Sequence, residues 1–350
     1  MSNYSLAEKK EYFAVDLTKF IVAYLNMSVH FTIFKDVNTD FNFWWTQVFC
    51  RVSVPYFFIA SGYFSANKLQ DKEKILVYLK RIFQMYVLYT LIFLPDLINE
   101  YKRERLGLVE GVLEFLKAFF FTGSYFHLWY FLALMVGVAL IYLLINHVKL
   151  DDKRLLIVTG IFYGIGTLGN AYRNVWRGIP AIENIWTMYE SLFMTTRNGI
   201  FFSPLLIVLG YLIRKHSAKI TYKRYWLYTL GFFAIMNVEE YFALALTNHA
   251  GQSMLFSTPF VVVTLFLTTC FITASPKLVP IGIFLRNMSV IVYGLHILIH
   301  LWFGPELSGY TYVMEGFSYF LMMAKRITIV AAVIVGLSRF KLFSWLRYLY

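Results

Sequence analysis

Long apolar segments recur along this chain, and they constrain its fold more than any other feature. The first, residues 13–34, has the roughly 20 residues that a helix needs to cross the hydrocarbon core of a bilayer. Backbone groups at that depth must be hydrogen-bonded within the segment, so such segments become helices. The sequence predicts an all-α, polytopic membrane bundle of about ten transmembrane helices. The predicted spans lie near 13–34, 45–66, 77–98, 127–146, 154–170, 199–214, 224–247, 254–274, 282–302 and 321–340.

Composition supports a location in the cell membrane. Hydrophobic residues make up 59% of the chain and charged residues only 15%, and mean hydropathy is +0.59. Soluble domains are about one quarter charged. The net charge of +12 comes largely from basic residues that border apolar spans, so we expect membrane lipids as partners and no nucleic acid. No long polar segment interrupts the spans. Residues 1–350 are therefore predicted to form a single domain, with the linkers 99–126 and 171–198 folded back against the membrane.

The Lys and Arg residues of the loops predict the orientation. With the N-terminus placed inside, twenty of the 32 Lys and Arg residues, among them Lys9, Lys10 and Arg286, fall on the cytoplasmic side and ten on the other. The remaining two, Lys19 and Arg51, lie inside predicted spans and are assigned to neither side. Because cytoplasmic loops carry an excess of Lys and Arg, both termini are expected in the cytoplasm.

This topology assigns a depth to each ionisable side chain. Lys19 lies in the inner part of the first span, and His30 lies near its outer end, eleven residues and about 16 Å further along the helix. Arg51 lies in the outer third of the second span. Ionisable groups inside a span are costly unless paired or hydrated, so they are functional candidates. We expect an outer-leaflet site that draws on four further side chains, namely His127, Arg197, Glu239 and Glu240.

Each candidate also has a structural interpretation, which the sequence leaves open. Lys19 can extend its amine to the inner interface, and His30 can form a hydrogen bond between helices. Arg51 can form a purely structural ion pair with Glu239 or Glu240. His127 can belong to an aromatic belt at the membrane interface, and Arg197 can act as an anchor there.

Several motif-like features are interpreted as structural. His296 and His300 share a helical face at the i, i+4 spacing of a metal site, but no third ligand is nearby in the sequence, so no metal is expected. Cys50 and Cys270 lie in separate apolar segments and predict neither a disulfide framework nor a zinc site. The GIGTLG run at 164–169 matches a nucleotide-binding pattern but follows no predicted strand. Its small residues instead favour close helix packing.

Four segments in order carry a family resemblance. The first is KFIVAYLNMSVH at 19–30, with a basic residue and a histidine at its ends. RVSVPYFFIASGYF at 51–64, YFHLWYFLAL at 125–134 and SVIVYGLHILI at 289–299 follow. Together they resemble the corresponding segments of the family 3 acyltransferases, which are integral membrane proteins of about ten helices. Within that family, HLWYF together with TRNGIFFSPLLIVLG at 196–210 most resembles the membrane module of VanT-type serine racemases.

The resemblance implies a reaction and a set of roles. It implies transfer of an acyl group, usually acetyl, from cytoplasmic acyl-CoA to a hydroxyl of an extracytoplasmic glycan or other cell-envelope acceptor. Acyl-CoA would be a co-substrate, and no bound cofactor is expected. His30 would act as base or nucleophile, Arg51 or His127 would stabilise the carbonyl oxygen, and Lys19 would contact the donor.

The likeness to VanT-type proteins implies an alternative function. Those proteins continue into a soluble pyridoxal-phosphate racemase domain, whereas this sequence ends at FSWLRYLY, so racemase activity is not expected from these residues. The alternative is a membrane module that binds or transports L-serine.

Overall fold

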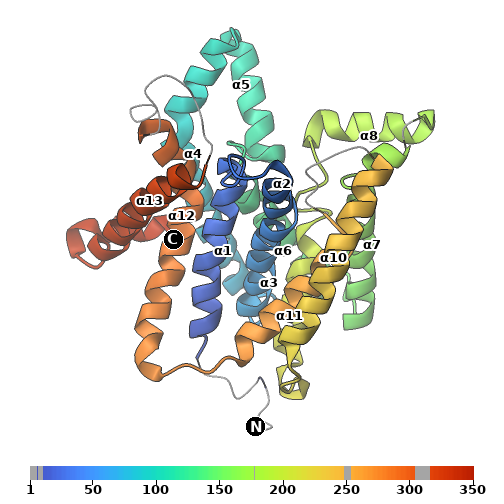
Figure 1. The fold of residues 1–350 in the computed structure, drawn as a ribbon, viewed down its shortest axis with the longest axis vertical. Helices are drawn as coiled ribbons and strands as arrows, with labels where there is room; N and C mark the ends of the chain where they lie inside the picture. The colour runs from blue at the N-terminus through green and yellow to red at the C-terminus, as the bar shows by residue number, and fades with distance from the viewer. Residues whose placement is uncertain (1–5, 7–10, 177, 248–253, 304–315) are drawn as a thin grey trace. The chain divides into compact units, whose positions relative to one another are not determined.

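The computed structural model describes residue 6 and residues 11–176, 178–247, 254–303 and 316–350. Over these residues the chain forms helices and connecting segments without a β-strand (Figure 1), which confirms the predicted all-α class. The α-helices are α1 (Phe13–Phe31), α2 (Thr39–Gln47), α3 (Ser53–Ser65), α4 (Lys72–Arg103), α5 (Leu108–Lys117), α6 (Trp129–Asn146), α7 (Asp152–Leu168), α8 (Pro180–Phe193), α9 (Ser203–Lys215), α10 (Tyr225–Thr247), α11 (Thr258–Phe271), α12 (Val279–Phe303) and α13 (Phe317–Leu337).

The protein is a polytopic helical membrane protein. Within the described ranges, five helical segments have the length and hydropathy of membrane spans, and α11 is a shorter apolar helix. The five lie in α4, α6, α10, α12 and α13. The number of spans and the orientation of the termini stay predictions, and Lys9 and Lys10 lie outside the described residues.

The predicted second span, 45–66, is wrong as one continuous helix. Helix α2 ends at Gln47, a short 3₁₀ turn called η2 covers Phe49–Val52, and α3 begins at Ser53. Pro55 explains the break, because it has no N–H to donate to the carbonyl of Arg51, as a continuous helix requires. Proline is tolerated where it stands, in the first turn of α3, since no donor is needed there. Arg51 therefore lies on the 3₁₀ turn and not on a regular helix.

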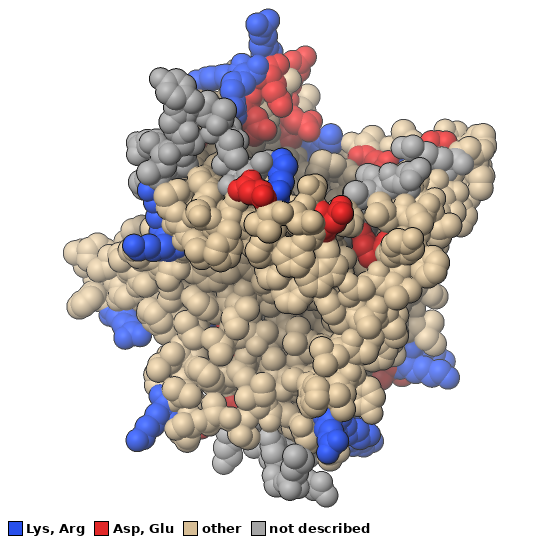
Figure 2. All heavy atoms as spheres, viewed as in Figure 1, with Lys and Arg blue, Asp and Glu red and all other residues tan. Residues whose placement is uncertain are grey.

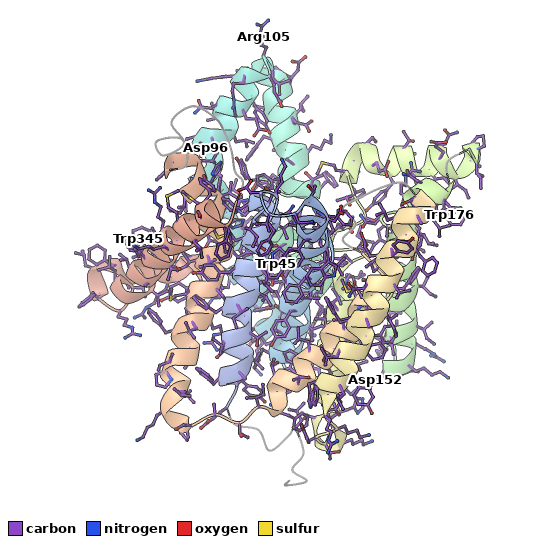
Figure 3. All side chains as sticks on the ribbon, viewed as in Figure 1. Trp45, Asp96, Arg105, Asp152, Trp176 and Trp345 are labelled. Carbon is purple, nitrogen blue, oxygen red and sulfur yellow. The ribbon has the colours of Figure 1, made fainter. Side chains whose placement is uncertain are left out.

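The two predicted linkers each contain a helix, α5 in 99–126 and α8 in 171–198. Helix α4 has 32 residues and so a length of about 48 Å, which exceeds the roughly 30 Å of a hydrocarbon core. Figure 2 shows the charged side chains of the α4–α5 hairpin gathered at its tip, where Figure 3 labels Arg105. A charged tip on an over-long helix is expected to project into water.

The chain divides into two compact units, and each is described by itself. Unit 1 comprises residues 1–57, 217–231 and 261–350, and unit 2 comprises 58–216 and 232–260. In unit 1, α1 packs along α12, and α13 packs against both helices. In unit 2, α6 packs between α4 and α9, and α7 packs on α9. The prediction of a single domain over 1–350 is not tested by this division.

Small residues allow the closest helix contacts in unit 2. A Cβ on Gly62 of α3 would lie 2.1 Å from the carbonyl oxygen of Ile207, and one on Gly210 would lie 2.0 Å from that of Ile59. Backbones therefore meet directly where α3 crosses α9. In the GIGTLG run, a Cβ on Gly166 would lie 2.7 Å from the Met254 and Phe201 side chains, which agrees with the packing interpretation.

Candidate functional site

Two histidines meet in unit 1, where α1 packs against α12. The rings of His30 and His296 are stacked with centroids 5.4 Å apart and planes 28° apart. His296 is fully buried, whereas His30 is partly exposed. The stacking gives His30 a fixed neighbour on one face and leaves part of its ring accessible. The packing of α1 against α12 thus unites the first and the last of the four resembling segments.

The hydrogen bonds of His296 indicate which of its nitrogens carries the proton. Nδ1 lies 2.8 Å from the carbonyl oxygen of Tyr293 and 3.1 Å from that of Val292. A carbonyl oxygen can only accept, so Nδ1 must be the N–H donor. In a neutral imidazole, Nε2 is then the basic nitrogen.

His300 lies one helical turn beyond His296 and has a different environment. Its Nδ1 is hydrogen-bonded to the hydroxyl of Tyr319 on α13, and its ring contacts Phe31 edge-on at 5.7 Å. Across the described ranges, no three His, Cys, Asp or Glu side chains are grouped so that they could hold a metal ion. The i, i+4 pair thus connects α12 to α1 through His296 and to α13 through His300.

A charged cluster lies toward the other end of the α1–α12 contact. The buried Asp16 carboxylate lies 3.9 Å from the Arg286 guanidinium, and it interacts electrostatically with Lys19, one turn further along α1. A Cβ on Gly282 would lie 3.2 Å from the Phe13 ring and 3.5 Å from the Asp16 carboxylate, so the start of α12 runs close to α1 here. Two cations around one carboxylate leave a net positive charge, which suits an anionic group.

Arg51 lies on the η2 turn, also in unit 1, and its guanidinium donates to the side-chain oxygen of Gln47. The neighbouring Cys50 Sγ lies 3.1 Å from the hydroxyl of Ser28 on α1. The same hydroxyl accepts a hydrogen bond of 3.1 Å from the indole of Trp45, labelled in Figure 3. Ser28 precedes His30 by two residues. The turn that carries Arg51 is therefore attached to the helix that carries His30.

The predicted outer-site residues of unit 2 occupy separate environments. His127 is buried among the rings of Phe93, Tyr125 and Phe126, with centroids 4.9–5.6 Å away. The aromatic-belt and catalytic interpretations of His127 both stay predictions. Arg197 places its guanidinium over the Trp129 ring at 4.7 Å, a cation–π geometry.

Glu239 holds a turn of unit 2. Its carboxylate accepts hydrogen bonds from the backbone N–H groups of Phe256 and Ser257 at 2.6 and 2.8 Å, and from the Ser257 hydroxyl at 2.5 Å. The Tyr172 hydroxyl donates a fourth at 3.2 Å. Glu239 thus fixes the segment that leads into α11. Its neighbour Glu240 is buried, and the predicted pairing of Arg51 with either glutamate stays a prediction.

Sequence reasoning missed three residues that the structure brings to the candidate site. His296 stood in the resembling segment 289–299 but was considered only for a metal site. Asp16 lies three residues before Lys19, a spacing that places both on one helical face. That spacing was an available signal for the charged cluster. Arg286 was counted among cytoplasmic loop residues, and only the packing of α12 on α1 shows that it meets Asp16.

The fold and the paired histidines define an integral membrane protein with a polar site on its first helix. Residues 12–338 match the family profile described as "Acyltransferase domain", and the chain therefore belongs to this acyltransferase family. This confirms the family suggested by the four segments. No solved structure matches the chain.

The curated relatives carry a different kind of name. An "Amino-acid racemase" of Enterococcus faecalis is 27% identical over 265 residues, which is 72% of this chain and 36% of that protein. A "Serine/alanine racemase" of Enterococcus gallinarum is 34% identical over 180 residues, which is 50% of this chain and 25% of that protein. The matched parts thus span about a quarter to a third of these relatives' lengths, and the likeness to VanT-type proteins is confirmed.

Proposed function

We propose that this protein is a membrane O-acyltransferase that moves an acyl group, typically acetyl, from cytoplasmic acyl-CoA to a hydroxyl of an extracytoplasmic glycan or cell-envelope acceptor. The observation that carries the proposal is the stacked pair of His30 and His296 inside a chain of the acyltransferase family. The charged cluster on the same two helices adds support, because it suits the phosphates of a donor.

The donor end of the site is Lys19 with Arg286. Both are cations that can pair with phosphate oxygens, and Asp16 between them limits their mutual repulsion. On α1, Lys19 lies eleven residues or about 16 Å before His30. The pantetheine arm of acyl-CoA would span this distance and bring the thioester to His30.

The chemistry at His30 is general-base catalysis. His30 removes the proton of the acceptor hydroxyl, the acceptor oxygen attacks the thioester carbonyl, and the carbon–sulfur bond breaks to release the CoA thiolate. The proton on His30 then passes to that thiolate. Arg51 is the proposed partner for the carbonyl oxygen as negative charge develops. His296, buried and hydrogen-bonded to the backbone, is proposed to hold the orientation of His30 by stacking.

The test is acyl transfer by the purified protein in nanodiscs with radiolabelled acetyl-CoA and cell-envelope acceptors. We expect His30→Gln to lower turnover by about 10²-fold or more while thermal unfolding stays near that of the wild type. The matched control is His147→Gln, which changes a histidine that follows the end of α6. Turnover of His30→Gln within twofold of the wild type would remove His30 from the chemistry.

The names of the relatives favour a second candidate function, a membrane module that binds or transports L-serine. Binding of labelled L-serine to the same nanodiscs measures it directly. Saturable serine binding without release of CoA from acetyl-CoA would favour this function over acyl transfer.

A further inference from the structure

A partly open hollow with a cavity volume of about 50 Å³ lies within unit 2, and the acyl-transfer proposal does not use it. Three segments form it: the end of the first linker, the first half of α6, and the segment that connects α8 to α9. The lining residues are Phe120, Phe121, Thr122, Trp129, Leu132, Ala133, Val136, Phe193, Thr195, Arg197, Asn198, Gly199 and Ile200. Both linkers that the sequence predicted to fold back against the membrane therefore contribute to one cavity.

The wall of the hollow is largely apolar. Three phenylalanines line it, and Phe121 meets Phe193 edge-on with ring centroids 5.5 Å apart. Leu132 and Val136, one helical turn apart on α6, also line it. Phe120 is 59% exposed, so the apolar wall is open to an occupant. Such a wall favours a hydrocarbon chain over a polar solute.

One cation stands at this apolar wall. Arg197 places its guanidinium over the Trp129 ring at 4.7 Å, and its backbone N–H donates to the Thr195 hydroxyl at 3.2 Å. Among the described lining residues, Arg197 is the one that carries a charge. A guanidinium in this setting suits a phosphate or carboxylate, which it can bind through two parallel hydrogen bonds.

Asn198 shapes the segment that carries Arg197. Its side-chain oxygen accepts hydrogen bonds from the backbone N–H groups of Ile200 at 2.9 Å and Phe201 at 3.2 Å. Its amide nitrogen donates to the Thr195 carbonyl at 3.0 Å and to the Tyr189 hydroxyl. Both polar atoms of the Asn198 side chain are hydrogen-bonded within this turn, so Asn198 stabilises the turn, and Arg197 is the residue proposed to bind an anion.

Two backbone features keep the hollow in this form. The segment Ala118–Thr122 is a π-helical turn, a conformation that often occurs at functional sites. It ends at Gly123, whose φ of +99° favours glycine, and a Cβ there would lie 2.6 Å from the Trp129 backbone nitrogen. On the other side, a Cβ on Gly199 would lie 2.4 Å from the Cβ of Val136. Both connecting segments therefore approach α6 through glycines.

We propose that this hollow binds a single-chain anionic amphiphile, with the hydrocarbon chain along the phenylalanine wall and a phosphate head at Arg197. The predicted topology places Arg197 at the outer interface of the membrane, where the head of such a molecule would lie in contact with water. An amino-acid zwitterion fits less well, because the described lining offers no carboxylate to its ammonium group and surrounds it with aromatic carbon.

The experiment compares two photoactivatable probes on the full chain in nanodiscs of neutral lipid. One is a diazirine-bearing dodecyl phosphate, and the other is the dodecanol with the same chain and no charge. We expect the phosphate to label residues 120–136 and 193–200 at a concentration about tenfold lower than the alcohol. Equal labelling by both probes, or labelling elsewhere, would overturn the proposal without any variant being needed.

Variants then separate the head from the chain. Arg197→Gln should lower labelling by the phosphate about tenfold and leave labelling by the alcohol unchanged. Val136→Trp should reduce both, because it fills the hollow. The matched control is Arg173→Gln, which changes an arginine of the second linker that pairs with Glu190 at 3.0 Å and does not line the hollow. An effect of Arg173→Gln as large as that of Arg197→Gln would contradict the assigned head site.

Competition identifies the source of the anion. We expect excess inorganic phosphate, L-serine and L-alanine to leave labelling by dodecyl phosphate unchanged, since none of them has a chain to bury. Displacement by inorganic phosphate would show a simple anion site, and displacement by either amino acid would show an amino-acid site; both results refute the proposal. Because labelling measures binding and not turnover, its failure is distinguishable from failure of the acyl-transfer proposal.

Discussion

The carboxylate of Glu239 provides the sharpest test of how unit 2 is held together. It accepts four hydrogen bonds, three of them from Phe256 and Ser257 just before α11 and one from Tyr172. The Ser257 side of this contact is buried. If Glu239 were a catalytic group, its replacement would chiefly change turnover. If it holds the turn, the replacement will chiefly change stability.

The structure gives the expected magnitude for Glu239→Gln. The glutamine keeps one acceptor oxygen, but its NH₂ group now faces donors that the second carboxylate oxygen had satisfied. A hydrogen bond to a charged group contributes about 1.5–3 kcal/mol, and a buried donor left without an acceptor costs a similar amount. Because these effects overlap, we expect a total loss of about 2–4 kcal/mol. At about 1.4 °C per kcal/mol for a chain of this size, the melting temperature should fall by about 3–6 °C.

The assay is thermal unfolding in detergent, combined with hydrogen exchange at the amides of residues 256 and 257. Exchange there should accelerate in Glu239→Gln more than in the rest of unit 2. Glu183→Gln is the matched control, since that glutamate lies on α8 and its carboxylate accepts a long hydrogen bond of 3.4 Å from the Gly178 amide. An unchanged melting temperature together with unchanged exchange at residues 256 and 257 would refute the reasoning.

Three further predictions concern packing, pH and donor binding. Gly62→Ala should lower the free energy of unfolding by about 3 kcal/mol or more, measured by thermal unfolding, because its Cβ would lie 2.1 Å from the Ile207 carbonyl oxygen and the backbone there cannot move aside. Gly231→Ala is the control, since it has open space around it and should leave stability unchanged. Burial raises the pKa of Asp152, but hydrogen bonds from Lys215 and a neighbouring histidine outweigh this effect and leave the pKa below its ordinary value of 3.8. The stability that the wild type gains over Asp152→Asn should therefore be full above about pH 4 and be lost as the pH falls further. Lys19→Ala should raise the KM for acetyl-CoA with little change in kcat, and the opposite pattern in steady-state kinetics would exclude a donor-binding role.

The Asp152 carboxylate is partly buried. Figure 3 labels it at the start of α7, where Lys215 and His216 approach from the end of α9. The contact joins two helices of unit 2 at their ends, so its loss at low pH should loosen that end before the helices separate.

The sequence by itself determined the class of the protein. Segments of apolar residues long enough to cross a bilayer can satisfy their backbone groups only as helices, so the all-α class followed from length and hydropathy. The sequence also determined the distance between Lys19 and His30 along the first helix, because helix geometry fixes their separation and relative direction without reference to any neighbouring helix. Four short segments in order were enough to indicate the family.

Breaks in helices were harder to predict. The run 45–66 is apolar on average, and a hydropathy average does not register the missing N–H of Pro55. The helices α5 and α8 were also absent from the prediction, because a helix of 10 or 14 residues is too short to stand out as a membrane span.

Only the tertiary structure decided which side chains share a site. His296 reaches His30 from a segment more than 250 residues away, and Arg286 reaches Asp16 by the same packing of α12 on α1. The two backbone N–H groups that the segment before α11 places on the Glu239 carboxylate could not be inferred from the sequence, and the pairing of Glu239 with Arg51 stays a prediction. Contacts of this kind depend on which helix faces pack together. A hydropathy pattern shows which faces are apolar, but it cannot show which of them meet another helix, because lipid and protein interior are both apolar.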